Sequence, residues 1–161
     1  MSGNDLAEIV NVLNLYALAI DTAQWDLFDH VFTPDVRLQY PKVGATWNDL
    51  ASLKKKMDEA HESIESSQHF TTNHQVVVNG DEANALSYVY VRTLPKGGGD
   101  CFEMGAWYDD VLVRTSAGWR IKSRTCRVSE TTSASATYEK TTLRRAGAAG
   151  EIAYLDALRS S

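Results

Sequence analysis

The clearest pattern in the chain is a run of apolar residues at helical spacing within the first 20 positions. They recur three and four positions apart, as one face of an α-helix requires, at Leu6, Ile9, Val10, Leu13, Tyr16, Ala17 and Ile20. Asn4 or Asp5 can cap the start of this helix. Tyr16 and Asp21 lie on opposite rims of the apolar face, about 140° apart at roughly 100° per residue. An acid is unfavourable at the negative end of a helix dipole, so Asp21 is predicted to look into the space that the helix covers.

Two further helices and a series of strands are predicted after this helix. A short helix is expected over 23–30 and is ended by Thr33-Pro34-Asp35, and a helix capped by Asn48 is expected over 49–64. Alternating patterns and turn residues predict strands over 36–40, 68–78, 84–94, 101–115 and 119–128. Helices followed by a long antiparallel meander predict an α+β architecture, in which a strongly curved antiparallel sheet wraps around the N-terminal helices.

The length of 161 residues fits one domain. We expect the domain formed by the curved sheet and the helices, an α+β barrel, to span residues 1–128. Residues 129–161 are expected to be a polar linker and a helix-prone C-terminal tail of the same domain. The formal charge of −5, without a basic block, argues against a nucleic-acid surface. No apolar run approaches the roughly 18 residues of a membrane span, and the polar N-terminus shows no secretory signal. Cys101 and Cys126 match no zinc spacing. Because no secretory signal is visible, free thiols and a cytoplasmic location are expected.

The stretch from Gln68 to Val78 places two of the four histidines at the start of a strongly β-forming run. Because successive strand residues point to opposite faces, His69 and Asn73 are predicted to share one face and His74 the other. A proton carrier beside an amide suits an interior pocket. The alternative is that both histidines are partly exposed strand-end residues whose polar atoms are satisfied by neighbours.

Short motifs follow one another in a fixed order between residues 4 and 128. They are Tyr16-x4-Asp21, Trp25-Asp26-x-Phe28, Phe32-Thr33-Pro34-Asp35-Val36, His69-x3-Asn73, Asn79-Gly80-Asp81-x-Ala83, Gly105-x2-Tyr108-x-Asp110 and Gly118-Trp119-Arg120-Ile121. In order and spacing this set resembles the SnoaL-like members of the nuclear transport factor 2-like superfamily. The resemblance implies a cone-shaped α+β barrel.

Within that group the chemical parallels are scytalone dehydratase, bile-acid 7-alpha-dehydratase and hexachlorocyclohexane dehydrochlorinase, which are eliminating enzymes without a cofactor. The resemblance implies that their acid corresponds to Asp21, their histidine to His69, and the bile-acid enzyme's tyrosine to Tyr16. The dehydrochlorinase's late arginine corresponds to Arg124, whereas the bile-acid enzyme's arginine is nearer to Arg127. The second histidine of scytalone dehydratase has no counterpart here, which argues against scytalone itself as substrate.

These four residue types are sufficient for a β-elimination. A histidine near neutral pKa can remove a C–H proton, and a carboxylate bonded to its other nitrogen fixes its tautomer. A buried tyrosine or arginine can donate to oxygen. We therefore expect a lyase of the dehydratase type that needs no cofactor or metal and acts on a hydrophobic cyclic or aromatic small molecule. Its binding residues are predicted to be Trp25, Phe28, Tyr40, Asn73, Tyr90, Trp107 and Tyr108.

Other functions remain open at this point. The same histidine and aspartate could serve an isomerase or cyclase of an enolisable ketone. The fold also serves as the non-catalytic small subunit of aromatic-ring-hydroxylating dioxygenases, or as a binding or scaffold module. No nucleic-acid or membrane partner is expected. A sheet face left uncovered by helices predicts a homo-oligomer, and the resemblance to the eliminating enzymes favours a trimer over a dimer.

Overall fold

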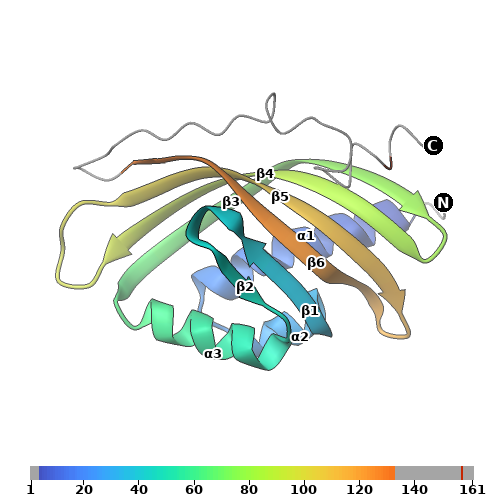
Figure 1. The fold of residues 1–161 in the computed structure, drawn as a ribbon, viewed down its shortest axis with the longest axis horizontal. Coiled ribbons are helices and arrows are strands. Elements are labelled where there is room, and N and C mark those ends of the chain that lie inside the picture. The colour runs from blue at the N-terminus through green and yellow to red at the C-terminus, as the bar shows by residue number, and fades with distance from the viewer. Residues whose placement is uncertain (1–3, 133–156, 158–161) are drawn as a thin grey trace.

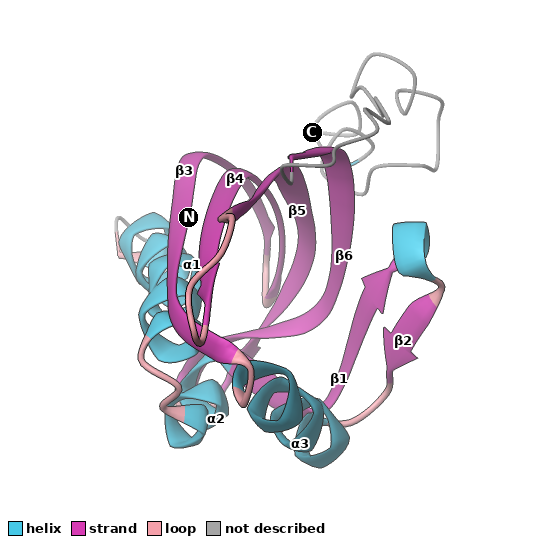
Figure 2. Cartoon of the chain, turned by 90° about the vertical axis from the view of Figure 1, so that its left-hand side faces the viewer, coloured by secondary structure: helices cyan, strands magenta, loops and turns pink. Residues whose placement is uncertain are grey.

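The computed structural model describes residues 4–132 and residue 157 of the chain. These residues form a curved sheet with helices packed against its inner face (Figures 1 and 2). The helices are α1 (Asp5–Asp21), α2 (Phe28–Val31) and α3 (Leu50–His61), with short 3-10 turns at Trp25–Leu27 and Pro41–Val43. The strands are β1 (Phe32–Tyr40), β2 (Ala45–Trp47), β3 (Ile64–Asn79), β4 (Glu82–Pro95), β5 (Phe102–Thr115) and β6 (Gly118–Thr132).

The six strands form one sheet in the order β2-β1-β6-β5-β4-β3. The long strands β3 to β6 pair antiparallel with their sequence neighbours, which confirms the predicted meander and the cone-shaped α+β fold. β1 pairs parallel to β6, so the sheet is mixed rather than purely antiparallel. This long-range pairing leaves no mark on local periodicity, because parallel neighbours are joined through a long connection of the chain.

Several predicted boundaries were wrong. β1 begins at Phe32 and runs through Pro34. Proline has no backbone N–H, but Pro34 is exposed and lies where the pairing of β1 with β6 is irregular, so no hydrogen bond from this position is needed. β2 was not predicted, because three residues are too few to show alternation. β6 continues to Thr132, past the expected end at residue 128. The rest of the predicted linker and tail lies outside the described residues, apart from residue 157.

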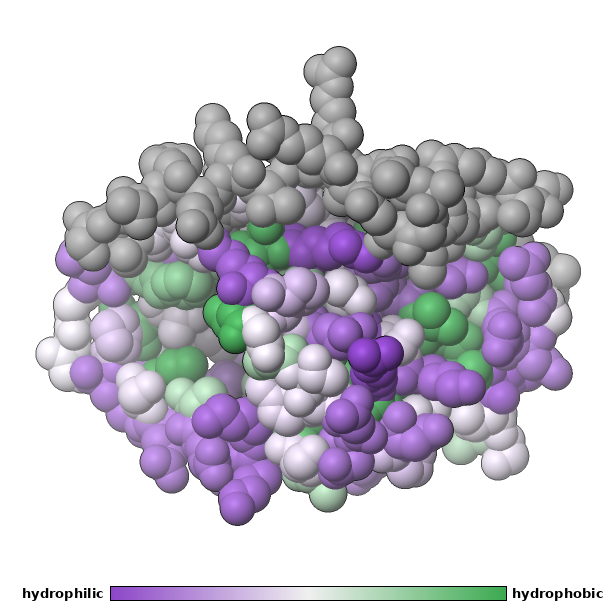
Figure 3. All heavy atoms as spheres, viewed as in Figure 1, coloured by the Kyte–Doolittle hydropathy of each residue, from purple (hydrophilic) through white to green (hydrophobic). Residues whose placement is uncertain are grey.

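The third helix starts one residue later than expected. Its cap is Asp49, whose carboxylate accepts a 2.7 Å hydrogen bond from the backbone N–H of Ser52, and not Asn48. Hydrophilic residues gather along α3 at the lower edge of the view in Figure 3, in keeping with the lysine run at 54–56 on its surface. Within the described part of the chain, no helix is long and apolar enough to cross a bilayer.

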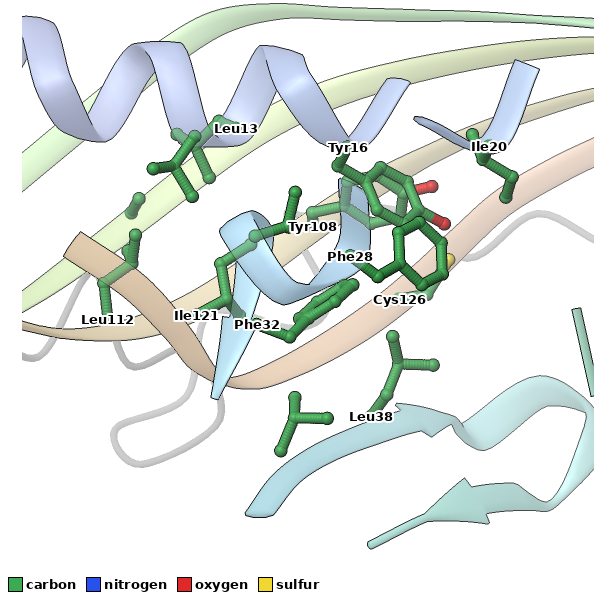
Figure 4. Close-up of a cluster of buried hydrophobic side chains, with 14 of the residues drawn as sticks. Leu13, Tyr16, Ile20, Phe28, Phe32, Leu38, Tyr108, Leu112, Ile121 and Cys126 are labelled. Atoms are coloured by element: carbon green, nitrogen blue, oxygen red, sulfur yellow. The ribbon is translucent and has the colours of Figure 1, made fainter. Parts of the chain in front are cut away.

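The core lies between α1 and the inner face of the sheet. α1 buries Ile9, Leu13, Tyr16 and Ile20, as its apolar spacing predicts, although Leu6 stays about half exposed, at 48%. Figure 4 shows Tyr16, Tyr108, Phe28 and Phe32 side by side in this core, with the sulfur of Cys126 close to the tyrosine hydroxyls. Large side chains of this kind contribute about 1.5–3 kcal/mol each when fully buried.

The outer face of the sheet carries an aromatic strip formed by Phe70, Tyr88, Tyr90 and Trp107. Phe70 contacts Tyr90 with ring centroids 6.4 Å apart, and Tyr88 contacts Trp107 at 5.8 Å. Phe70, Tyr88 and Tyr90 are each exposed by more than 40%. The apolar outer face expected from the sequence is therefore present, but His74, which was expected on it, lies on the inner side.

We predict that the aromatic strip mediates self-association, because exposed apolar patches are unusual on soluble monomers. Sedimentation of the chain at micromolar concentration should give a species larger than its 17.8 kDa mass, with a trimer favoured. Replacing Tyr88 and Tyr90 together by serine should shift the population toward monomer. Val43→Ser, at an exposed position between β1 and β2, is the matched control and should leave the assembly unchanged. A wild-type monomer would contradict this prediction.

Candidate active site

The last residue of α1 and the inner face of β3 meet in a short hydrogen bond. Asp21 Oδ1 lies 2.6 Å from Nδ1 of His69. The second carboxylate oxygen of Asp21 accepts the backbone N–H of His69 at 2.7 Å, and Oδ1 also accepts from the hydroxyl of Ser67 at 2.9 Å. The prediction that Asp21 and His69 lie within hydrogen-bond reach is confirmed. Three donors from one strand hold the carboxylate in a single orientation.

This arrangement assigns the tautomer of the His69 ring. Because an ionised carboxylate can only accept hydrogen bonds, Nδ1 carries the proton and donates it to Asp21. Nε2 then keeps its lone pair. No described residue makes a hydrogen bond to Nε2. The ring edge also contacts Tyr16, with centroids 6.1 Å apart and planes at 87°. His69 therefore has the form that a general base requires.

The carboxyl group of Asp21 is only partly buried. Burial by itself would raise its pKa, but the hydrogen bonds from the ring and backbone of His69 and from Ser67 favour the charged form more strongly. The net effect is a pKa below the ordinary value of 3.8. Asp21 is thus ionised at neutral pH and can stabilise a charged His69 ring.

Arg124 lies over the ring of Tyr16, inside the core. Its guanidinium carbon is 4.3 Å from the ring centre of Tyr16 and 4.0 Å from that of Tyr108. Asp110 holds it through two bonds, accepting from Nε at 2.7 Å and from Nη2 at 2.8 Å, and neither side chain is exposed. Arg127 points to the outer face instead and pairs with Asp109 at 3.1 Å. Of the two arginines left open by the sequence, Arg124 is the one inside.

Asp110 was not predicted as a site residue. The register of the sheet places it directly opposite Arg124 across β5 and β6. Two positions after Tyr108 on β5, it also shares the inner face with that residue. Strand alternation could have placed Asp110 inside, but its partner depends on the pairing register, which the sequence does not show.

Nη1 of Arg124 is the nitrogen that has no hydrogen-bond partner, and it is fully buried.

Three tyrosines gather around this ion pair. Burial raises the pKa of Tyr16, Tyr40 and Tyr108, while the positive charge of Arg124 acts in the opposite direction on all three. They are therefore neutral and able to donate a proton in a hydrogen bond. The hydroxyl of Tyr108 is buried and has no hydrogen-bond partner in the described structure. Burial likewise raises the pKa of the Cys126 thiol to about 12, so it remains protonated.

The structure brings together four of the seven residues predicted to bind substrate. Phe28 and Tyr108 are fully buried in the core, and Tyr40 and Trp25 are partly buried against it. Trp25 contacts Phe28, with centroids 5.5 Å apart, and donates its ring N–H to Asp58 at 2.9 Å. Their position around Tyr16 gives the interior an aromatic lining.

The other three predicted binding residues do not lie in this interior. Tyr90 and Trp107 belong to the aromatic strip on the outer face, because strand alternation turns them away from their neighbours Val89, Val91 and Tyr108. Asn73 is exposed, and its φ of 53° places it in the left-handed region. Asparagine tolerates this backbone conformation better than most residues.

The conformation at Asn73 also overturns the prediction that His74 faces away from His69. The pairing of β3 with β4 passes from Thr72↔Tyr88 to Gln75↔Leu86, so β3 holds one extra residue there. Such a bulge resets the alternation of the strand. His74 is therefore turned inward, where its ring contacts Ser87 and Asn14.

Ser67 connects the Asp21–His69 pair to a pocket of about 330 Å³ at the ends of β3 and β4. It is lined by Ser66, Ser67, Gln68, Arg92, Leu94 and Cys101. This lining is more polar than the aromatic one predicted for a substrate. Within residues 4–132 and at 157, no three His, Cys, Asp or Glu side chains are grouped so as to hold a metal ion.

We predict that Asp110→Asn lowers the free energy of unfolding by roughly 3–5 kcal/mol, because it leaves the charge of Arg124 buried without compensation. Urea unfolding followed by circular dichroism measures this loss. Asp81→Asn removes the same kind of partner from the exposed Arg114 and should change stability little. Equal effects of the two substitutions would contradict the structural importance of the buried pair.

Asp21 should make wild-type stability sensitive to acid. Its pKa is lowered in the folded state, so its contribution is complete above the unfolded value near 3.8 and is lost as the pH falls through the folded value. Between about pH 5 and pH 2.5, wild type should therefore lose more stability than Asp21→Asn. Asp26→Asn, at an exposed position, serves as control. Parallel curves for wild type and Asp21→Asn would show that the carboxylate is not stabilised by folding.

Comparison with known sequences gives relatives over most of the chain. The sequence profile of the SnoaL-like domain matches residues 2–125. An uncharacterized protein of Mycobacterium tuberculosis (strain H37Rv) is 32% identical over 122 residues, which is 75% of this chain and 83% of that protein.

Solved structures share the fold at low sequence identity. A candidate scytalone dehydratase from Novosphingobium aromaticivorans has a TM-score of 0.74 at 21% identity, over 87% of this chain and 96% of that one. Hexachlorocyclohexane dehydrochlorinase LinA-type3 from Novosphingobium barchaimii has a TM-score of 0.71 at 15% identity, with coverages of 84% and 94%. A nuclear transport factor 2-like superfamily protein from Salmonella enterica has a TM-score of 0.72 at 16% identity, with coverages of 80% and 93%.

The profile match extends from before α1 to within β6 and so includes Tyr16, Asp21, His69 and Arg124. The structural neighbours have the same cone-shaped α+β fold. The chain therefore belongs to the SnoaL-like domain family, and it shares its fold with a nuclear transport factor 2-like superfamily protein.

Proposed function

We propose that this protein is a cofactor-independent lyase that removes water from a hydrophobic cyclic or aromatic hydroxy-ketone. The observation that carries the proposal is the Asp21–His69 pair, in which Nδ1 of His69 is bound and Nε2 is left without a described partner beside Tyr16. A histidine oriented in this way by a carboxylate can act as a general base. The carboxylate is already in place to stabilise the positive charge that the ring gains when it takes up a proton.

The proposed reaction is a β-elimination. Nε2 of His69 takes the proton from the carbon next to the carbonyl, and the electron pair of that C–H bond becomes the enolate. The electrons then form the carbon–carbon double bond as the C–O bond to the leaving hydroxyl breaks. The hydroxyl accepts a proton from the His69 ring and leaves as water. If Tyr16 donates this proton instead, the charged His69 ring returns one to Tyr16. Asp21 stabilises the charged ring between these two steps.

The buried residues around Tyr16 would stabilise charge on the substrate oxygen. Tyr16 and Tyr108 are neutral donors, and the hydroxyl of Tyr108 has no hydrogen-bond partner in the described structure. Arg124 favours the ionised form of both and so makes each a stronger donor to a developing enolate. Because two of its nitrogens are bound by Asp110, Arg124 acts mainly through its charge and through Nη1.

The structural neighbours support elimination as the class of reaction. One is named as a candidate scytalone dehydratase and another as a dehydrochlorinase, and both names describe eliminations. At 21% and 15% identity the likeness concerns the fold, so the reaction is argued from the site itself.

The same pair of residues also supports a second enzymatic reaction. An isomerase or cyclase of an enolisable ketone needs the same base and the same oxygen donors. The isomerase returns the proton to a different carbon. In the cyclase the enolate carbon forms a bond to a second carbonyl carbon, whose oxygen takes up the proton. A non-catalytic small subunit of a ring-hydroxylating dioxygenase, by contrast, has no use for a carboxylate held by three donors against a histidine. The geometry therefore favours a reaction that begins with proton removal.

The test is a screen of cyclic hydroxy-ketones and phenolic alcohols for loss of water, followed by the ultraviolet absorbance of the conjugated product. His69→Ala should lower the rate by roughly 10²–10⁴-fold, because it removes the base. His30→Ala replaces an exposed histidine of α2 and should keep the wild-type rate. Full activity of a folded His69→Ala protein would refute the mechanism. Activity that is lost with a chelator and restored by a divalent ion would refute the claim that the mechanism needs no metal.

A further inference from the structure

We propose that His74 is a positioning residue of the same site, because its ring ties α1 to β4 and holds the helix where Asp21 meets His69. The clamp formed by Asn14, His74 and Ser87 is a feature of the described structure in its own right. The effect that we assign to it on turnover rests on the proposed function.

The contacts of the clamp span three elements. Nε2 of His74 lies 3.1 Å from Oδ1 of Asn14 on α1, and Nδ1 lies 2.8 Å from the hydroxyl oxygen of Ser87 on β4. Thr71 of β3 also donates to Oδ1 of Asn14, at 3.3 Å. Ser87 is only 1% exposed, so the sheet end of the clamp is fixed in the core.

These contacts assign a tautomer to His74 that is opposite to that of His69. The amide oxygen of Asn14 can only accept, so Nε2 of His74 carries the proton and donates it. Nδ1 then accepts from the hydroxyl of Ser87. In this neutral tautomer both nitrogens are bound, so neither is available as a base. In His69 the proton is on Nδ1 instead.

The two histidines hold one face of α1 at two points. Asn14 and Asp21 are seven positions apart, which is about two helical turns and the same side of the helix. Asn14 accepts a hydrogen bond from His74, and Asp21 accepts one from His69. The extra residue near Asn73 makes this double attachment possible, because without it His74 would point outward. Tyr16 lies between the two attachment points along the helix, and its ring contacts that of His69.

The surroundings of His74 keep its ring neutral. Burial lowers its pKa below the ordinary 6.5, with a smaller effect of Arg124 in the same direction and of Asp110 in the opposite one. Its partner on α1 is an uncharged amide, in contrast to the carboxylate beside His69. An uncharged amide does not stabilise a charged ring as a carboxylate would.

Nuclear magnetic resonance of the ¹⁵N-labelled full chain tests the clamp without a substrate. Long-range ¹H–¹⁵N spectra at neutral pH should show His74 as the neutral Nε2–H tautomer, and His69 with its proton on Nδ1. Asn14→Asp places a carboxylate beside Nε2 and should make the His74 ring charged at a pH at which the wild-type ring is neutral. A wild-type His74 that is already charged at this pH, or has its proton on Nδ1, would overturn the proposal.

Substitutions test the positioning role. His74→Leu should speed amide exchange in the second half of α1 roughly 5–10-fold, disturb the Nδ1 proton signal of His69 and lower kcat about tenfold. His74→Gln keeps a donor and an acceptor and should restore part of each property. His30→Leu is the matched control. If His74→Leu fails to fold, Asn14→Ala at an exposed position removes the same contact.

The outcomes separate the clamp from the proposed function. An undisturbed His69 signal and unchanged exchange in His74→Leu or Asn14→Ala would overturn the clamp, even if wild type removes water from a substrate. The expected tautomers and a loosened α1, found in a protein that removes water from no compound of the screen, would leave the clamp standing and refute the lyase.

Discussion

The packing of α1 along the inner side of β3 is the constraint on which the rest of the site depends. It brings Asp21, the last residue of the helix, into three hydrogen bonds from β3, and it turns Tyr16 toward the core. The helix has its apolar face on one side and its polar site residues at the rim of that face, so burial of the apolar face also determines where the reactive groups lie. A shift of α1 by one turn would separate Asp21 from His69.

Buried charge is the second unusual feature of the interior. Arg124 and Asp110 are fully buried among aromatic rings, where such a pair gives little net stability compared with apolar side chains. In the proposed mechanism the pair has a purpose, since the charge of Arg124 acts on the tyrosine hydroxyls around it. Its orientation is fixed by the two bonds from Asp110. The interior thus combines an apolar lining with a few fixed polar groups, as ligand sites do.

The fold and the central pair could be predicted from the sequence because both depend on short-range patterns. The spacing of α1 and the strand phase at His69 placed Asp21 and His69 on facing surfaces, and the structure brings them within 2.6 Å. Two of the errors come from features without a local pattern. One extra residue at Asn73 reversed the direction of His74, and only the register between β5 and β6 reveals Asp110 as the partner of Arg124. Tyr90 and Trp107 were assigned to the pocket by residue type, although alternation places them outside.

The central claim is that Asp21 fixes His69 in the tautomer whose Nε2 removes a proton from carbon. The most direct measurement is exchange of the α-protons of 2-tetralone, a cyclic ketone, for deuterium in D₂O at neutral pH, followed by proton magnetic resonance. The account predicts that wild type catalyses this exchange. The asparagine of Asp21→Asn can donate to Nδ1 of His69 and so favour the tautomer in which Nε2 carries the proton. This variant should therefore be slower by roughly 10²–10⁴-fold while its fold is unchanged. Exchange by a folded Asp21→Asn protein at the wild-type rate, or no exchange by wild type, would contradict it.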